Sequence, residues 1–193
     1  MGKSEMADVF ASGRRRGSLY AYRVRGLGRS GVVLWVGGRG DEPDQVVSLP
    51  EADRCRVPVF TTVRQARVYA IRRGRGLAAS GADTLELTRV QHWLEAPERR
   101  RVPSGAVLEA WNFFEDLARG LDEVRQLPQQ DAVHDSAYEK LFGDEYAAWT
   151  PAEKRAVLEL MRVGVELWNS CPVSVKPCSS IVSDSGRGAS GDS

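Results

Sequence analysis

The residues with the clearest potential for chemistry lie along one stripe of a predicted helix. When residues 107–123 are projected at 100° per residue, polar side chains gather opposite the apolar ones. The members of this stripe are Glu109, Asn112, Glu115, Asp116, Arg119, Asp122 and Glu123. Five carboxylates beside one guanidinium make an acidic surface, and such surfaces speed encounter with basic partners. The plainer alternative is a solvated helix face on which Glu115 pairs with Arg119 at the i,i+4 spacing.

A catalytic or metal-binding pattern is not visible among the histidines, cysteines and adjacent acids. His92 and His134 stand apart, and Cys55, Cys171 and Cys178 do not have zinc-ligand spacing with them. A nucleophile needs a base within hydrogen-bond reach, and no such pair can be named. Neighbouring helical acids point about 100° apart, which also argues against an acid–base pair. We therefore predict a protein that is not an enzyme and that needs no cofactor and no metal.

A glycine motif in the first half matches a dinucleotide fingerprint only in its letters. Gly26, Gly28 and Gly31 spell GxGxxG after a predicted strand. The fingerprint requires a helix next, whose N-terminal amides meet the pyrophosphate. Here the β-branched run 32–36 follows, so the motif predicts a hairpin turn.

The helix that carries the polar stripe is predicted to be the central element of the core. Its apolar arc spans about half of the circumference, which is wide enough to pack on two neighbours. The arc comprises Val107, Ala110, Trp111, Phe114, Leu117, Ala118 and Leu121, with Leu108 and Phe113 at its edges. Ser104 is the candidate N-cap of this helix.

The other predicted elements give an α+β fold. Alternating or β-branched runs at 19–25, 32–36 and 46–49 predict an antiparallel meander, and 57–60 adds a short edge strand. Capping signals open helices at Thr62 and at Thr150, and a short helix is expected at 137–142. The stretch 84–94 is ambiguous between a strand and a strand that runs into a helical turn. We expect three to four helices on one face of a small antiparallel sheet. The predicted organisation is a basic arm (1–17), one domain (18–170) and a disordered tail (171–193).

Charge is distributed unevenly along the chain. Residues 1–101 hold 19 Lys and Arg against 11 Asp and Glu, whereas residues 102–193 hold 8 against 15. Arginine clusters at 14–16, 72–75 and 99–101 leave open an alternative function as a nucleic-acid-associated or regulatory protein. These clusters have few interleaved aromatic residues and no recognisable binding motif, so a nucleic-acid partner is possible but not favoured. The sequence has no apolar run of membrane-spanning length and no secretory signal, so a cytoplasmic protein is expected.

Part of the chain resembles a group of small bacterial immunity-like proteins associated with polymorphic-toxin and contact-dependent inhibition systems. The resemblance covers roughly residues 85–168 and rests mostly on packing aromatics. It is carried by Trp93, Trp111-Asn112 with Asp116, the run 138–142, the run 149–153 and the run 164–167. The chain departs from the pattern between Phe142 and Trp149, where six residues stand in place of a longer loop.

The resemblance implies a non-catalytic protein that binds and neutralises a cognate bacterial toxin domain. An immunity protein covers the active site of its toxin, and a nuclease toxin would present a basic site to an acidic inhibitor. The candidate partner-binding residues are Glu109, Asn112, Asp116, Glu123, Asp144 and Glu145. The oligomeric state is left open.

Overall fold

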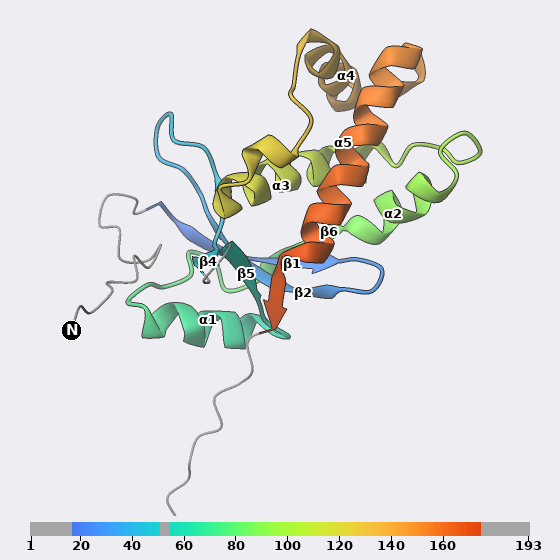
Figure 1. Ribbon diagram of the computed structural model, residues 1–193. Coiled ribbons are helices and arrows are strands. Elements are labelled where there is room, and N and C mark those ends of the chain that lie inside the picture. The colour runs from blue at the N-terminus through green and yellow to red at the C-terminus, as the bar shows by residue number, and fades with distance from the viewer. Residues whose placement is uncertain (1–16, 51–54, 175–193) are drawn as a thin grey trace, which may run out of the picture.

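The computed structural model describes residues 17–50 and 55–174, and these form an α+β fold (Figure 1). The predicted fold class is confirmed. A four-stranded sheet has the order β3-β2-β1-β6, and a smaller sheet has the order β4-β5-β7. The strands of the larger sheet are β1 (Leu19–Arg25), β2 (Ser30–Val36), β3 (Gln45–Val46) and β6 (Ala82–Glu86). The smaller sheet contains β4 (Leu49–Pro50), β5 (Cys55–Val59) and β7 (Pro172–Ser174).

The larger sheet is mixed and not purely antiparallel as predicted. The meander is present, because β1 pairs with β2 and β2 with β3 in antiparallel fashion. The fourth strand, β6, pairs with β1 in parallel from Ala21↔Ala82 to Arg25↔Glu86. The reason is the long connection through α1 (Val63–Arg72), which lets the chain re-enter beside β1 in the same direction.

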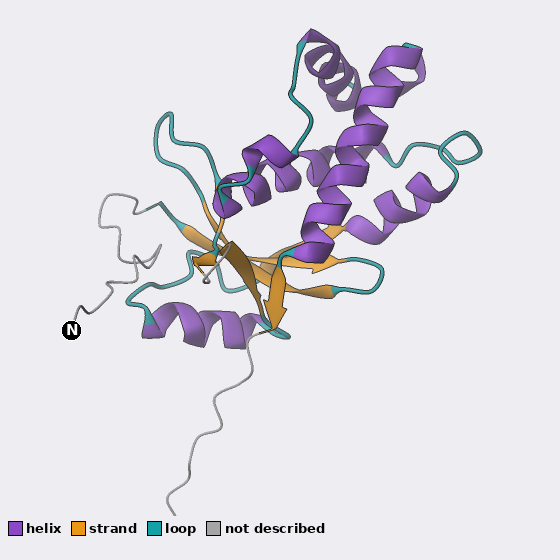
Figure 2. Cartoon of the chain, in the orientation of Figure 1, coloured by secondary structure: helices purple, strands orange, loops and turns teal. Residues whose placement is uncertain are grey.

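Helices cover both faces of the larger sheet, whereas the sequence predicted only one covered face. Figure 2 shows α1 below the strands and the other four helices above them. Side chains alternate along β1 and β2, so Ala21 and Leu34 pack toward α1 while Val24 and Val33 join the larger core above. The unbroken apolar run of β2 fits this arrangement, because a strand buried on both faces needs apolar residues at successive positions.

The helical layer contains α2 (Leu87–Glu95), α3 (Ser104–Leu121), α4 (Ala132–Phe142) and α5 (Pro151–Ser170). Single 3₁₀ turns, η1 (Val124–Gln126) and η2 (Tyr146–Ala148), precede α4 and α5. The ambiguous stretch 84–94 is a strand that runs directly into a helix, as one of its two readings predicted.

Capping signals were right at Thr62 and Thr150 and wrong at Ser104. The Thr62 side chain accepts a hydrogen bond from the backbone N–H of Gln65, and Thr150 forms a complete capping box with Glu153. Ser104 lies inside the helix, and its hydroxyl donates to Asp144 Oδ1 at 2.8 Å. Pro103 occupies the N-cap position, so Ser104 links α3 to the turn after α4.

The core confirms that α3 is the central helix. It contacts α2, α4 and α5 as well as β3. Phe113 packs edge-on against Trp168 of α5, with ring centroids 5.6 Å apart. Gly164 of α5 lets that helix approach closely, because a Cβ there would lie 2.1 Å from Phe114 Cδ2.

The predicted basic arm (1–17) and the predicted disordered tail (171–193) lie mostly outside the described residues. Residues 1–16 of the expected basic arm, and the tail from 175 on, lie outside the described residues. Pro172–Ser174, which the sequence assigned to the disordered tail, forms β7 and pairs in parallel with Val57–Val59 of β5. The main chain after α5 thus returns to the smaller sheet, with Cys171 buried beside it. None of the helices in the described part of the chain is long and apolar enough to cross a membrane.

Candidate functional site: an acidic pocket on the core helix

One face of α3 forms the wall of a pocket that opens beside β1, β2 and β3. Its volume is about 460 Å³. The lining residues are Tyr22, Trp35, Asp44, Glu109, Asn112, Glu115, Asp116 and Arg119. Four carboxyl groups therefore face one guanidinium. We call this cavity the acidic pocket.

Asp116 is buried, although the sequence placed it on the solvated stripe of α3. Only 6% of its surface is exposed. The cause is the close approach of β3, which the absence of a side chain at Gly120 permits. A Cβ at Gly120 would lie 2.0 Å from the Val46 carbonyl oxygen, and the Ser48 hydroxyl donates to the Gly120 carbonyl. The loop before β3 is thereby held over the last turns of α3.

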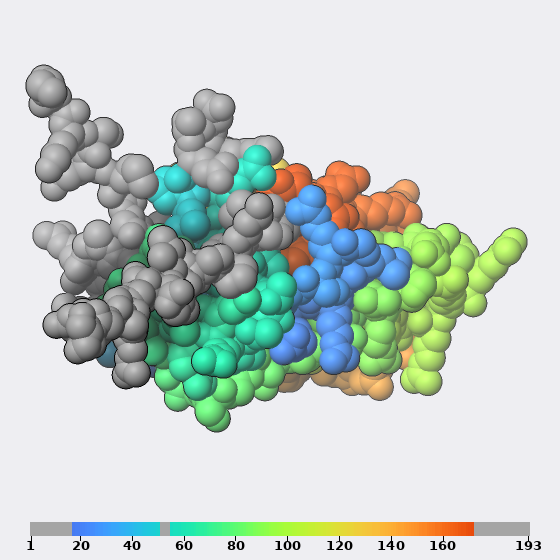
Figure 3. Space-filling view, turned by 90° about the horizontal axis from the view of Figure 1, so that it is seen from below, coloured from blue at the N-terminus to red at the C-terminus, as the bar shows by residue number. Residues whose placement is uncertain are grey.

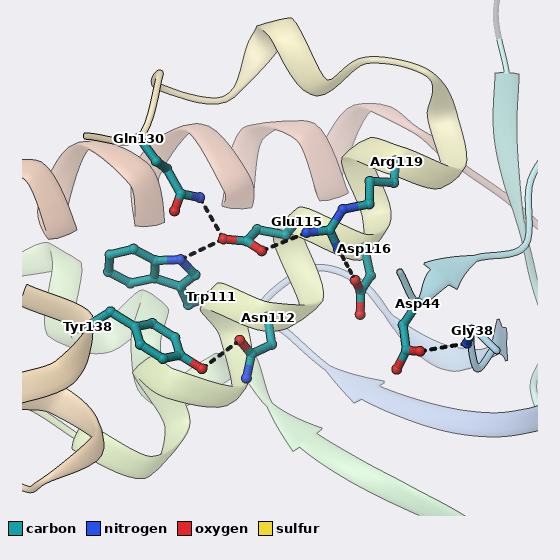
Figure 4. Close-up of polar contacts among 9 residues, drawn as sticks. All are labelled: Gly38, Asp44, Trp111, Asn112, Glu115, Asp116, Arg119, Gln130 and Tyr138. Carbon is teal, nitrogen blue, oxygen red and sulfur yellow. Dashed lines mark hydrogen bonds and ion pairs between the residues drawn. The ribbon is translucent and has the colours of Figure 1, made fainter. Parts of the chain in front are cut away.

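Burial raises the pKa of Asp116 to about 7, and the nearby carboxylates of Asp44 and Glu115 act in the same direction. The guanidinium of Arg119 opposes this shift, since it forms an ion pair with Asp116 Oδ1. Figure 4 shows Asp116 and Asp44 facing a common space, with no bond drawn between them. A carboxyl group that is half protonated near neutral pH can exchange a proton with, or form an ion pair with, whatever enters the pocket.

Glu115 holds the upper wall of the acidic pocket in place (Figure 4). Its Oε1 accepts from Trp111 Nε1 at 2.9 Å and also from the Gln130 amide. Its Oε2 accepts from Arg119 at 2.8 Å, which is the i,i+4 ion pair that the sequence predicted. This network links α3 to the loop before α4 and fixes the Arg119 guanidinium between two carboxylates.

Asp44 lies on the opposite wall and is positioned by its own loop. The Gly38 N–H donates to Asp44 Oδ1 at 2.7 Å across the turn that precedes β3. Gly40, at φ +60°, supplies the left-handed conformation that this turn needs. Asp44 is exposed, and it thus presents a charged carboxylate at the mouth of the acidic pocket.

Two aromatic residues of the sheet complete the lining. Tyr22 of β1 and Trp35 of β2 pack edge to face, with ring centroids 4.9 Å apart. Burial raises the pKa of the Tyr22 phenol, and the charges of Glu109 and Asp83 add to the rise. Burial is also the main cause of the raised pKa of Glu109. The lining thus ranges from the buried Asp116 to the exposed Asp44 and Glu109, and electrostatic contacts are strongest at the buried end.

The acidic pocket continues into two neighbouring cavities. One of about 430 Å³ shares Tyr22, Trp35 and Asp44 with it and extends along β1 toward residues 79–83. The other, of about 590 Å³, shares Glu115 and Arg119 and extends along the loop 124–130. The three cavities are neighbours that share these lining residues, and we call them together the acidic trough.

The structure gathers three of the six predicted partner-binding residues in this pocket and separates the other three from it. Glu109, Asn112 and Asp116 line the acidic pocket, where Asn112 accepts from the Tyr138 hydroxyl at 3.1 Å. Glu123 is half-buried just beyond α3, and its backbone N–H caps that helix through Ala118. It lies outside the lining, because the helix ends at the left-handed residue Asp122 and turns Glu123 off the stripe.

Asp144 and Glu145 are exposed, but they lie in the turn after α4 and do not line the acidic pocket. Asp144 accepts a hydrogen bond from Ser104 and therefore connects the turn after α4 to the first turn of α3. Tyr22, Trp35 and Asp44 also line the acidic pocket, but they were not among the site residues predicted from the sequence. The signal for the two aromatics was their place on one face of adjacent strands, since Tyr22 and Trp35 fall at alternate positions from the buried Val24 and Val33.

The structure describes both histidines and two of the three cysteines, while Cys178 lies outside the described residues. His134 is buried and completes a capping box with Asp131 at the start of α4, and His92 is exposed beside Glu95. Cys55 and Cys171 are free thiols. The described residues contain no group of three or more His, Cys, Asp and Glu side chains arranged to hold a metal ion.

The described arginine clusters do not merge into one basic surface. Arg72 ends α1 and residues 73–75 follow it, whereas residues 99–101 belong to the loop after α2, and Figure 1 places the two at opposite sides of the molecule. Figure 3 shows the β1–β2 hairpin between these regions on the lower face. Arg100 pairs with Glu95 at 3.0 Å, and Arg101 donates to the Tyr146 hydroxyl at 2.7 Å.

No family model, curated protein or solved structure matches this chain. The assignment of a function therefore depends on the geometry of the acidic trough and on the chemistry of its lining.

Proposed function

We propose that this chain is a non-catalytic binding protein that neutralises a protein toxin, with the acidic trough as its contact surface. The observation that carries the proposal is the acidic pocket itself, in which four carboxyl groups and one guanidinium surround a cavity of about 460 Å³ on the central helix. A basic segment of a partner has both the charge and the convex shape that this cavity requires.

Preorganisation supports a binding role. Asp116 is held by Arg119, Glu115 by Trp111, and Asp44 by Gly38. Side chains that are already fixed lose little conformational freedom when a partner docks, so more of the contact energy appears as affinity. The α3 wall of the pocket belongs to the central helix of the core, and the opposite wall is held by the hydrogen bond from Gly38 to Asp44.

The distribution of charge supports a basic partner. The chain as a whole has a formal net charge of +1, yet the acidic pocket combines four acids with one arginine. A concentrated charge of one sign in a partly enclosed site focuses the field and steers an oppositely charged partner. Basic surfaces of this kind occur around the active sites of enzymes that act on nucleic acid.

The lining also supports a role without catalysis. The residues that line the acidic pocket include no serine, threonine, cysteine or histidine. A serine or cysteine nucleophile activated by a histidine base therefore cannot be assembled from this lining.

The test begins with the full chain, tagged and recovered from its host, and with a functional assay on the recovered partner. We expect a protein whose toxicity or nuclease activity is suppressed by an equimolar amount of this chain. The association rate is then measured for the double variant Asp44→Asn, Glu109→Gln at low and high salt. We expect a fall of about tenfold at low salt that shrinks at high salt, because exposed charges are screened over roughly 10 Å at 0.1 M.

Glu166→Gln is the matched control, because Glu166 is an exposed acid of α5 outside the trough. It should leave the association rate unchanged. Recovery of nucleic acid without a protein partner would contradict the proposal and favour the nucleic-acid alternative. An unchanged rate in the double variant, with the partner still neutralised, would move the contact surface away from the trough.

A further inference from the structure

One oxygen of Asp116 has no hydrogen-bond partner in the described part of the chain. Oδ1 accepts from Arg119, and no hydrogen bond reaches Oδ2. The residue is only 6% exposed, yet it lines the acidic pocket. Among the described residues, Oδ2 is not one of the fully buried polar atoms that lack a partner, so it faces the open side of the pocket, where a donor on a ligand can replace water.

Two further carboxylates of the acidic pocket lack an ion pair among the described residues. Asp44 accepts only the backbone N–H of Gly38, and Glu109 is exposed at the rim. Arg119 cannot serve them, since Glu115 and Asp116 already occupy its guanidinium. The charge of Arg89 lowers the pKa of Glu109, but Arg89 does not line the acidic pocket, so Arg119 supplies the one guanidinium of its described lining.

An aromatic wall stands on the side of the acidic pocket that faces the sheet. Tyr22 and Trp35 both line the acidic pocket and pack edge to face. The indole N–H of Trp35 is buried without an acceptor among the described residues, and because it is a donor it cannot bond a cation, so the ring face is the part of Trp35 that a cation would contact. Aromatic faces attract cations, and a flat cation gains both this attraction and a large contact area.

We propose that the acidic pocket binds the guanidinium group of an arginine side chain, with Asp116 as its principal acceptor and Asp44 as a second one. Arginine fits better than lysine, because its planar fork offers five donors to separate carboxylates and its flat face packs on aromatic rings. The inference rests on the proposed function in that the arginine belongs to a protein partner.

Titration of Asp116 gives this inference a pH signature. Its pKa of about 7 means that the carboxyl is half protonated at neutral pH, because burial and the charges of Asp44 and Glu115 outweigh Arg119. The other groups that face it are Glu109 of α3 and the Tyr22 phenol of β1, and both have raised pKa values. A guanidinium favours the ionised carboxylate, so binding releases a proton and weakens as the pH falls below 7.

The experiment titrates the full chain with N-acetyl-arginine amide and follows the Trp35 indole N–H by NMR, with Trp35→Phe to assign the resonance. We expect saturable shifts at millimolar concentrations, and at least tenfold weaker binding of the citrulline analogue, which has the same shape without the charge. Affinity for the arginine probe should fall about tenfold from pH 8 to pH 6. The lysine analogue should bind more weakly than arginine.

Asp116→Asn should weaken binding of the arginine probe at least tenfold and abolish its pH dependence, and Asp44→Asn should weaken it severalfold. Asp122→Asn is the matched control, because this exposed acid has a left-handed backbone that asparagine tolerates. It should bind within twofold of the unchanged chain. Thermal melts of each variant show that the fold is retained.

Equal shifts with arginine and citrulline, or unchanged binding in Asp116→Asn, would overturn the inference. The proposed function fails separately. If a toxin is neutralised through the trough while the arginine probe does not bind, the guanidinium assignment is wrong and the proposed function stands. If the probe binds as expected and no partner protein is neutralised, the assignment stands and the proposed function is wrong.

Discussion

Asp116 of α3 and Glu153 of α5 are equally buried acids, with 6% and 5% of their surfaces exposed, yet their pKa values move in opposite directions. The pKa of Asp116 rises to about 7, and that of Glu153 falls to about 2. The two lie in different regions, one at the acidic pocket and the other where α4 meets the start of α5.

Loss of hydration on burial is the largest influence on the pKa of Asp116, whereas hydrogen bonds from the surrounding donors are the largest influence on that of Glu153. Glu153 accepts from Lys140 at 2.8 and 2.9 Å, from the Ser136 hydroxyl at 2.6 Å and from the Thr150 N–H at 2.6 Å. Asp116 has one donor residue and two acids nearby. A carboxylate whose oxygens all have hydrogen-bond donors stabilises the fold, whereas one with an oxygen that lacks a donor can accept a hydrogen bond from a ligand. Burial alone therefore does not tell the two roles apart.

The largest expected effect on stability comes from removing the Glu153 carboxylate. Glu153→Ala should lower the melting temperature by several degrees at pH 7, because Lys140 and the Thr150 N–H both lose their acceptor. A folded-state pKa below the ordinary 4.5 means that the stabilisation is complete above pH 4.5 and is lost as the pH falls toward 2. The difference in melting temperature between the two proteins should therefore shrink in acid. A difference that persists at pH 2 would show that packing, and not the carboxylate, matters there.

The second effect has the opposite sign. The folded-state pKa of Asp116 lies above its ordinary 3.8, so the folded chain loses stability as the pH rises from about 4 to 7. Asp116→Asn removes this loss and should be more stable than the unchanged chain at pH 8 by about 2 kcal/mol, a value discounted for water at the open side of the pocket. Denaturant unfolding at pH 5 and pH 8 measures the difference. Equal pH dependence in both proteins would contradict a raised pKa.

The smallest effect concerns the cations beside the two acids. Arg119→Met should raise the pKa of Asp116 above its present value of about 7, because the guanidinium is what opposes the rise. Lys140→Met should raise the pKa of Glu153 toward 4.5, because the lysine is the first cause of its depression. Carboxyl carbon titration by NMR follows both groups. If neither pKa moves, the neighbouring cations do not set the pKa values of Asp116 and Glu153, and the difference between the two acids has another cause.

Local patterns predicted much of the helical layer. The apolar arc of α3 was nearly complete, and the Thr150-Pro151-Glu153 signal placed the start of α5 at the right residue. These predictions succeeded because helical periodicity and capping depend on residues within four positions of one another. The same locality explains the confirmed ion pair between Glu115 and Arg119.

The site was predicted only on the side that α3 supplies. Glu109, Asn112 and Asp116 share a helical face, and that face is readable from spacing. Tyr22 and Asp44 come from β1 and from the loop before β3, at distances along the chain that no local period reports. The parallel pairing of β6 with β1 was missed for the same reason, since strand spacing shows alternation but not the direction of the neighbouring strand.

By itself, the sequence determined the α+β class, the central helix, its acidic stripe and the helix starts at Thr62 and Thr150. Only the tertiary structure decided that Asp116 is buried and faces Asp44. That outcome depends on Gly120, where the missing side chain lets the Val46 main chain approach α3, and on the loop that β3 carries with it. The helical period fixes the direction in which a side chain points, but a contact between distant segments decides whether water or another acid meets it there.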